Sequence, residues 1–166
     1  MLLHTRVLVA ASIGAAAFAT SAGTVDVSFV NAGRYWDAGS TTFDEEGNMK
    51  ALANLLQRLG QRLLPADQVL KVEVLQLELA GKVRQLLRDR PPVRVITNGS
   101  DAPHIKLRYS LETAGKPVAN GEEWLSDIDF TRGLARQRDN ESLYFEKRML
   151  EAWFKARFVD GTAAPG

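Results

Sequence analysis

The sequence predicts an α+β domain, a two-layer sandwich in which two helices cover one face of a mixed, mostly antiparallel sheet of about five strands. Two segments carry apolar residues at helical spacing, and the others alternate apolar and polar residues, as half-buried strands do. The expected order is β-α-β-β-β-β-α. The crossover through the first helix suits a parallel strand pair, and the short turns between the later strands suit antiparallel pairs.

The first residues predict export. "MLLHTR" ends in one basic residue and is followed by the uncharged run "VLVAASIGAAAFA" and by small residues. A basic start, an apolar run of roughly 7–15 residues and small residues at a cleavage site are typical of a secretory signal peptide. We expect residues 1–22 to be a signal peptide that is cut after Ala19 or Ala22. Residues 23–158 then form a single domain, and residues 159–166 form a flexible tail.

Composition narrows the classes of function. The chain has no cysteine, which excludes disulfides, thiolate metal sites, cysteine nucleophiles and a lipoprotein anchor. Its 21 Lys and Arg and 20 Asp and Glu alternate in sign along the sequence, whereas nucleic-acid-binding proteins usually have a clustered basic excess. No stretch after the signal peptide is apolar enough to span a membrane. We expect a soluble periplasmic protein without a cofactor that does not bind nucleic acid.

The spacing of apolar residues predicts the first strand and the first helix. "TVDVSFV" (24–30) alternates and predicts a strand. The segment 41–64 carries leucines at helical spacing and predicts a helix. Thr42 with Glu45 fits a capping box at its start. Pro65 ends it.

The segment "VLKVEVLQLELAG" (69–81) predicts a long strand whose apolar residues change face. The apolar positions up to Val74 share one face, but Leu75, Leu77 and Leu79 fall on the other. Because a one-residue offset flips every later side chain, a β-bulge near Val74–Leu75 is the simplest explanation. Otherwise the second half of the strand is apolar on both sides. Its outward leucines are then the best candidate for a partner interface.

The remaining segments complete the expected order. "GKVRQLLRDRPP" (81–92) predicts a connector. Strands are expected at "VRVIT", "HIKLRYSLET" and "VANGEEWLSDIDF", and the turns between them are "NGSDAP" and "AGKP". "ESLYFEKRMLEAWFKARF" (141–158) predicts the last helix.

Two glutamates are unusual because each is expected among apolar residues. On a helical wheel, Glu146 lies with the apolar residues of the last helix, namely Met149, Leu150, Trp153 and Phe154. The preceding hairpin raises a second case if its register pairs Thr113 with Val118. Glu122 then lies opposite Tyr109 and points inward. A buried carboxylate needs a partner or a chemical role.

Glu122 and Glu146 are therefore expected to meet between the sheet and the last helix. Two adjacent carboxylates can separate their pKa values and act as general acid and base, or they can bind a hard cation. The alternative is that each is neutralised locally by Tyr109, Arg148 or Arg157, whose long side chains reach inward from the edge of the layer.

Two further groups are candidate binding residues. Tyr35, Trp36 and Asp37 follow the first strand, where the aromatic pair could form a platform for a sugar or peptide or close the end of the sheet. Asp127 and Asp129 share a strand face, where they could bind a cation or simply be solvated.

Five stretches of the chain resemble a bacterial family known as domain of unknown function 3016. They are "VDVSFVNAGRYWDA", "LPADQVLKVEVLQLELAG", "RPPVRVITNGSDAPHIKLRYSL", "GEEWLSD" and "LYFEKRMLEAWF". The resemblance covers essentially the whole predicted mature chain. It implies an exported protein of about this size, with no established activity, ligand or catalytic residues. Such sequences often have Trp at the position of Ala102 and Tyr at the position of Phe145.

The function that these observations favour is a non-enzymatic binding or envelope-accessory domain whose partner is an envelope protein or a small ligand. One alternative is a hydrolase of envelope glycans that uses Glu122 and Glu146. The other is a divalent-cation-binding protein that uses Asp127 and Asp129. No GxSxG, HExxH, Walker A or GxGxxG pattern is present, and His104 is the only histidine after the predicted signal peptide.

Overall fold

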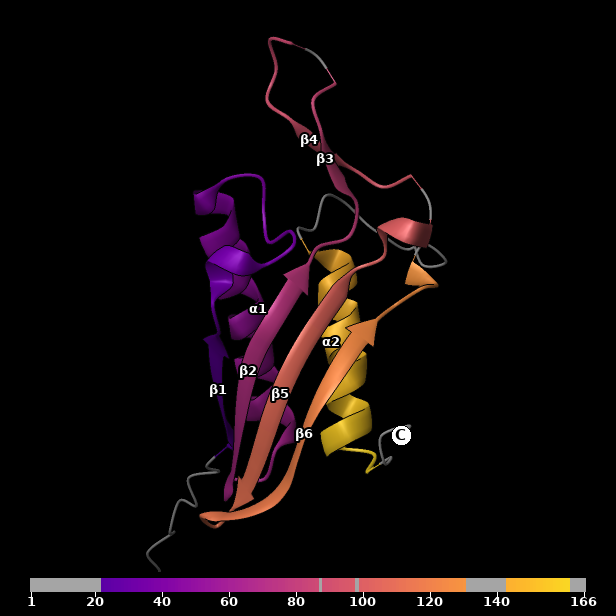
Figure 1. Cartoon of the computed structure of the whole chain (residues 1–166). Coiled ribbons are helices and arrows are strands. Elements are labelled where there is room, and N and C mark those ends of the chain that lie inside the picture. The colour runs from indigo at the N-terminus through magenta and orange to yellow at the C-terminus, as the bar shows by residue number, and fades with distance from the viewer. Residues whose placement is uncertain (1–21, 87, 98, 131–142, 162–166) are drawn as a thin grey trace, which may run out of the picture.

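The protein has two layers, a twisted sheet and two helices packed on one of its faces (Figure 1). The computed structural model describes residues 22–86, 88–97, 99–130 and 143–161. The predicted signal peptide up to residue 21 and residues 162–166 of the predicted tail lie outside the described residues.

The central sheet confirms the predicted α+β class. It has four strands in the order β1 (Thr24–Phe29), β2 (Gln68–Glu78), β5 (His104–Thr113) and β6 (Lys116–Ser126). β1 runs parallel to β2, and the other neighbours are antiparallel. The helices on one face are α1 (Thr42–Leu63) and α2 (Tyr144–Phe158). None of the described helices is long and apolar enough to cross a membrane.

The expected fifth strand of the sheet belongs to a separate ribbon. β4 (Val93–Val95) pairs with β3 (Lys82–Arg84), which lies in the segment predicted as a connector. The two short strands form a hairpin that projects from one end of the domain (Figure 1). We call residues 82–95 the arm.

α1 begins one residue earlier than the capping box predicted. Thr41 is the N-cap, and its side-chain oxygen accepts a hydrogen bond from the Asp44 backbone N–H at 3.1 Å. The helix ends before Pro65, as expected. α1 lies close to β1 because Gly60 has no side chain, and a Cβ added there would lie 2.2 Å from a methyl carbon of Val25.

The β-bulge in β2 is confirmed, since the pairing with β5 shifts between Val74 and Gln76. The bulge returns the later leucines to the helix-covered face, where Leu77 is 0% and Leu79 3% exposed. Leu75 is half-buried at the bulge. The prediction that these leucines form an outward apolar surface is therefore wrong, because the extra residue cancels the change of face.

The β5–β6 hairpin has a different register from the one expected. Thr113 pairs with Lys116 across a two-residue turn. The pairing between the two strands also shifts by one residue between Leu111 and Glu112. Together they place Glu122 opposite Arg108 rather than Tyr109. The prediction that Glu122 points inward is wrong for this reason, since the side chain lies on the open face of the sheet.

The core fills the space between the layers. Leu59 of α1, Leu107 of β5 and Phe154 of α2 are each 0% exposed. α2 packs against the sheet, as the contact between Tyr109 of β5 and Trp153 of α2 shows. The two rings meet edge-on at a centroid distance of 5.9 Å. A smaller apolar cluster near the base of the arm consists of Ala80, Ala102, Phe130 and Phe145.

Candidate functional site

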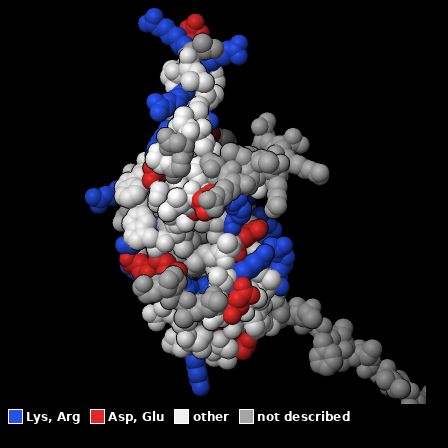
Figure 2. Space-filling model, turned by 90° about the vertical axis from the view of Figure 1, so that its right-hand side faces the viewer, with Lys and Arg blue, Asp and Glu red and all other residues white. Residues whose placement is uncertain are grey.

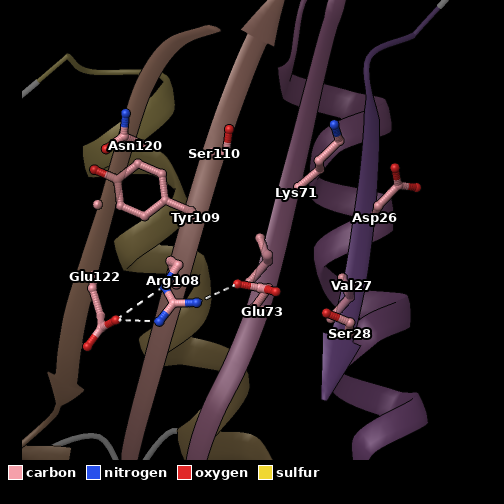
Figure 3. A pocket seen from close by; sticks show the side chains of 12 residues that line it. Asp26, Val27, Ser28, Lys71, Glu73, Arg108, Tyr109, Ser110, Asn120 and Glu122 are labelled. Atoms are coloured by element: carbon pink, nitrogen blue, oxygen red, sulfur yellow. Dashed lines mark hydrogen bonds and ion pairs between the residues drawn. The ribbon is translucent and has the colours of Figure 1, made fainter. Parts of the chain in front are cut away.

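The face of the sheet that the helices leave open carries polar side chains in rows across the strands (Figure 3). Strand pairing aligns one row of Asp26, Lys71, Ser110 and Asn120. The next row consists of Ser28, Glu73, Arg108 and Glu122. A groove of about 810 Å³ lies over these two rows. We call this surface the open face.

Arg108 is at the centre of the open face, between two carboxylates (Figure 3). Its Nη1 lies 3.0 Å from Glu73 Oε2, and its Nη2 lies 3.0 Å from Glu122 Oε2. Lys106 Nζ lies 2.6 Å from the other oxygen of Glu122. The hydrogen bonds from Lys106 and then Arg108 lower the pKa of Glu122 below its ordinary value. Exposed ion pairs of this kind contribute little stability, and here they place opposite charges side by side across β2, β5 and β6.

Two tryptophans border the same face. Trp36 and Trp124 stack with ring centroids 5.7 Å apart and an interplanar angle of 24°. They remain 60% and 53% exposed, although stacked indoles usually gain by burial. The Lys106 ammonium lies 5.7 Å from the Trp124 ring, so the aromatic pair continues directly into the charged row of Arg108.

The loop after β1 brings Trp36 across the sheet. The Trp36 backbone N–H donates to Gln76 Oε1 on β2 at 2.8 Å, and the Asp37 backbone forms an isolated parallel bridge with Glu78. Trp36 can therefore contact Trp124 on β6, although β1 and β6 are opposite edges of the sheet.

The two neighbours of Trp36 hold the loop in place. The Tyr35 hydroxyl donates to the Val74 carbonyl at 2.8 Å, and burial raises the pKa of Tyr35 to about 12. The Asp37 carboxylate makes a bidentate ion pair with Arg94, with N–O distances of 2.9 and 2.6 Å. Of the aromatic pair predicted as a platform, Trp36 is exposed, whereas Tyr35 and the neighbouring Asp37 are half-buried.

Glu146 is buried as predicted, at 2% exposure. Its Oε1 accepts a hydrogen bond from the Ala80 backbone N–H at 2.6 Å. Burial raises the pKa of Glu146, while the Ala80 hydrogen bond and the nearby charge of Arg94 oppose the rise. The partner that this buried carboxylate needs is thus a backbone N–H group. This carboxylate ties α2 to the end of β2.

The expected meeting of Glu122 and Glu146 does not occur. Glu122 is on the open face with Lys106, whereas Glu146 is buried on the helix-covered side. The residue of β6 that turns toward α2 is Glu123, which pairs with Arg157 at 2.9 Å. A pair of glutamates for general acid–base catalysis is therefore not formed by these residues.

The aspartates proposed as cation ligands lie beyond the end of β6. The Asp127 carboxylate pairs with Arg148, which also donates to the Phe130 carbonyl at 3.1 Å. Asp129 is exposed. Within the described part of the chain, no group of three or more His, Cys, Asp or Glu residues could hold a metal ion.

Sequence reasoning missed three residues of this surface. Lys106 and Arg108 alternate with apolar residues in β5, and this pattern by itself indicates no more than a solvated face. The register assumed for the hairpin, Thr113 with Val118, would place Trp124 opposite Leu107 and pointing inward, but Trp124 pairs with Lys106. The hairpin register decides that Glu122 and Trp124 share a face with Lys106 and Arg108, and composition carries no information about that register.

A protein-family model described as "Protein of unknown function (DUF3016)" matches residues 23–156. No curated protein and no solved structure matches the chain. The description assigns no activity, ligand or site residue.

Proposed function

The chain belongs to the DUF3016 family, as its sequence stretches indicated, and we propose that it is a non-enzymatic periplasmic domain that binds a saccharide chain on the open face. The observation that carries this proposal is the exposed Trp36–Trp124 stack beside the paired charges of Lys106 and Glu122. Export by the predicted signal peptide would place the domain, residues 23–158, among the glycans of the bacterial envelope.

The chemistry of the open face suits a sugar. The flat apolar side of a pyranose ring packs against an indole, which combines a large apolar surface with one polar group. Sugar hydroxyls can donate to carboxylates and accept from guanidinium groups, and hydrogen bonds to charged groups are the stronger ones. Arg108 and Glu122 offer both kinds of group within the groove. Few convergent polar groups beside an apolar surface are typical of ligand sites.

Binding without hydrolysis is favoured by the state of the carboxylates. A glycosidase needs one carboxylic acid with a raised pKa and a second carboxylate within about 5–9.5 Å. The pKa of Glu122 is lowered, which makes it a poor general acid. Glu146 has a raised pKa but is buried among apolar residues away from the open face.

The test is isothermal titration calorimetry with tetra-N-acetylchitotetraose as the probe. We expect saturable heat. Trp36→Ala and Trp124→Ala should each weaken binding by about tenfold, which corresponds to about 1.4 kcal/mol. Val118→Ala is the control, because Val118 is an exposed apolar residue of the same strand as Trp124, 56% exposed. It should leave the affinity unchanged.

Mass spectrometry of the incubated probe separates binding from catalysis. An intact tetrasaccharide after prolonged incubation supports the proposal, and shortened products would contradict its non-enzymatic part. Absence of saturable heat, or equal affinities of the wild-type protein and both tryptophan variants, would contradict the saccharide site.

A further inference from the structure

The arm is the one described part of the chain that extends well away from the two layers (Figure 1). Its strands pair only with each other, through Lys82↔Val95, Val83↔Arg94 and Arg84↔Val93. None of its described residues belongs to either apolar core cluster. Packing of the domain therefore does not explain why the arm is there.

The arm concentrates positive charge. It holds five basic residues and one acidic residue, while the whole chain has a formal net charge of only +1. The two basic residues at its base have partners, since Lys82 pairs with Glu78 and Arg94 with Asp37. The other three, Arg84, Arg88 and Arg90, are exposed and lie in the outer part of the arm, residues 84–86 and 88–90, which we call the tip. The space-filling view shows basic side chains and an acidic one at the end of the projection (Figure 2).

Apolar side chains are exposed among these arginines. Leu86 is 65% exposed, Val93 42% and Val83 36%. The Gln85 side chain donates to the Arg90 carbonyl at 2.5 Å, which ties the two sides of the tip together. The tip is thus a convex surface in which a leucine is flanked by arginines, with the exposed Asp89 between Arg88 and Arg90.

We propose that the tip of the arm docks on the surface of an anionic phospholipid bilayer, with Leu86 entering the headgroup region and Arg84, Arg88 and Arg90 contacting lipid phosphates. Basic residues near an anionic leaflet are attracted to it, and apolar side chains gain by entering the interface. A hydrated polyanion would satisfy the arginines but would leave Leu86 in water. A projecting convex tip can also reach a flat surface that the body of the domain would not touch. This surface is separate from the open face and does not depend on the proposed saccharide site.

The test uses a fluorescent reporter at the tip. Because the chain has no cysteine, Leu86→Cys gives a single attachment site for an environment-sensitive nitrobenzoxadiazole label. Val118→Cys places the same label at an exposed position on β6, outside the arm. Both labelled full-length proteins are titrated with vesicles of phosphatidylcholine alone and with vesicles that contain phosphatidylglycerol.

We expect the label at position 86 to shift to shorter wavelength only with vesicles that contain phosphatidylglycerol, and the label at position 118 not to shift. Replacing Arg84, Arg88 and Arg90 by Gln in the Leu86→Cys protein should weaken the affinity for these vesicles by about 100-fold, since each charge contributes about fivefold. The matched control replaces Arg58 and Arg62, exposed basic residues of α1, by Gln and should preserve the response. High salt should weaken it.

Several results would overturn the proposal. One is a wavelength shift of equal size with both kinds of vesicle. Another is an equal shift at positions 86 and 118. In either case the predicted signal peptide could account for vesicle association. Another is a response that survives the triple arginine replacement. A shift without vesicles that grows with protein concentration would assign the tip to a second copy of the chain. A shift with soluble heparin but not with vesicles would assign it to a polyanion.

Discussion

At the scale of single residues, Glu146 shows which part of a buried charge can be predicted. Its position on the helical wheel predicted burial, and the side chain is 2% exposed. Its partner could not be predicted, because the donor is a backbone N–H, that of Ala80, 66 residues away in the chain. Patterns of side chains carry no information about backbone donors left open at the end of a strand. The proposed partners were side chains for that reason.

The raised pKa of Glu146 gives a prediction about stability and pH. The ordinary pKa of this group is 4.5, and burial raises it in the folded protein. Between the two values the folded state keeps a proton that the unfolded state has lost, so the free energy of unfolding falls as pH rises through this window. Glu146→Gln resembles the protonated form and can still accept from Ala80. We expect this variant to lose that part of the pH dependence.

The measurement is urea unfolding of the wild-type and variant proteins from pH 4 to pH 8. The difference between the two free energies of unfolding should change with pH above about 4.5, in favour of the variant. Glu151→Gln on the same helix is the control and should follow the wild-type profile. A constant difference between wild type and Glu146→Gln would show that Glu146 does not titrate differently in the folded state.

At the scale of elements, the β5–β6 hairpin shows how one turn decides the composition of a face. The sequence predicted both strands, but the predicted position of Glu122 depended on a pairing of Thr113 with Val118. The structure closes the hairpin with Ala114 and Gly115, whose φ values are +49° and +73°. Positive φ at both central residues is typical of type I′ turns, which favour Asn-Gly over Ala-Gly. The weak turn signal therefore hid the register, and with it the positions of Glu122, Glu123 and Trp124.

The same turn gives a prediction about stability. Ala114 occupies a left-handed conformation that costs a non-glycine residue roughly 1–2 kcal/mol, whereas Asn tolerates it. Ala114→Asn should raise the free energy of unfolding by about 0.5–1 kcal/mol. Gly115→Ala should lower it by about 1 kcal/mol, since φ is also positive there. Urea unfolding measures both, and destabilisation by Ala114→Asn would contradict the turn geometry.

The contact of α1 with β1 gives a second prediction at this scale. Alanine is normally about 1 kcal/mol more favourable than glycine inside a helix. At Gly60 the new Cβ would lie 2.2 Å from Val25, so the layers would have to separate. We expect Gly60→Ala to lower the free energy of unfolding by about 1–3 kcal/mol despite the gain in helix propensity. Gly47→Ala is the control, because nothing lies within 4 Å of that position, and it should stabilise α1.

At the scale of the whole molecule, the sequence predicted the layers but not the arm. Apolar spacing reports burial against another layer, and the two helices and four strands of the sandwich follow from it. β3 and β4 have three residues each and stand outside the core. Strands of that length without a buried face give no periodic signal, so the segment could only be predicted as a connector and a further strand of the sheet.

This difference predicts that the fold does not need the arm. Val83 and Arg94 face each other across the ribbon, so replacing residues 84–93 by Asn-Gly would leave a two-residue hairpin of favourable type. The ion pair of Asp37 with Arg94 remains at its base. Shortening a loop recovers only a few tenths of a kcal/mol of closure entropy, up to about 1 kcal/mol here. The free energy of unfolding in urea should therefore stay within about 1 kcal/mol of the wild-type value.

One control variant and one further readout make this last prediction specific. Arg94→Gln in the full-length arm removes the partner of Asp37, which should destabilise the loop that carries Trp36 and lower the free energy of unfolding by about 1–3 kcal/mol. The shortened protein should keep the tryptophan stack, which can be followed by near-ultraviolet circular dichroism. A loss of more than about 3 kcal/mol in the shortened protein would exceed what closure entropy explains. It would mean that the arm stabilises the sandwich through contacts with the body. The presence of the arm would then be explained by stability, without a role at a membrane.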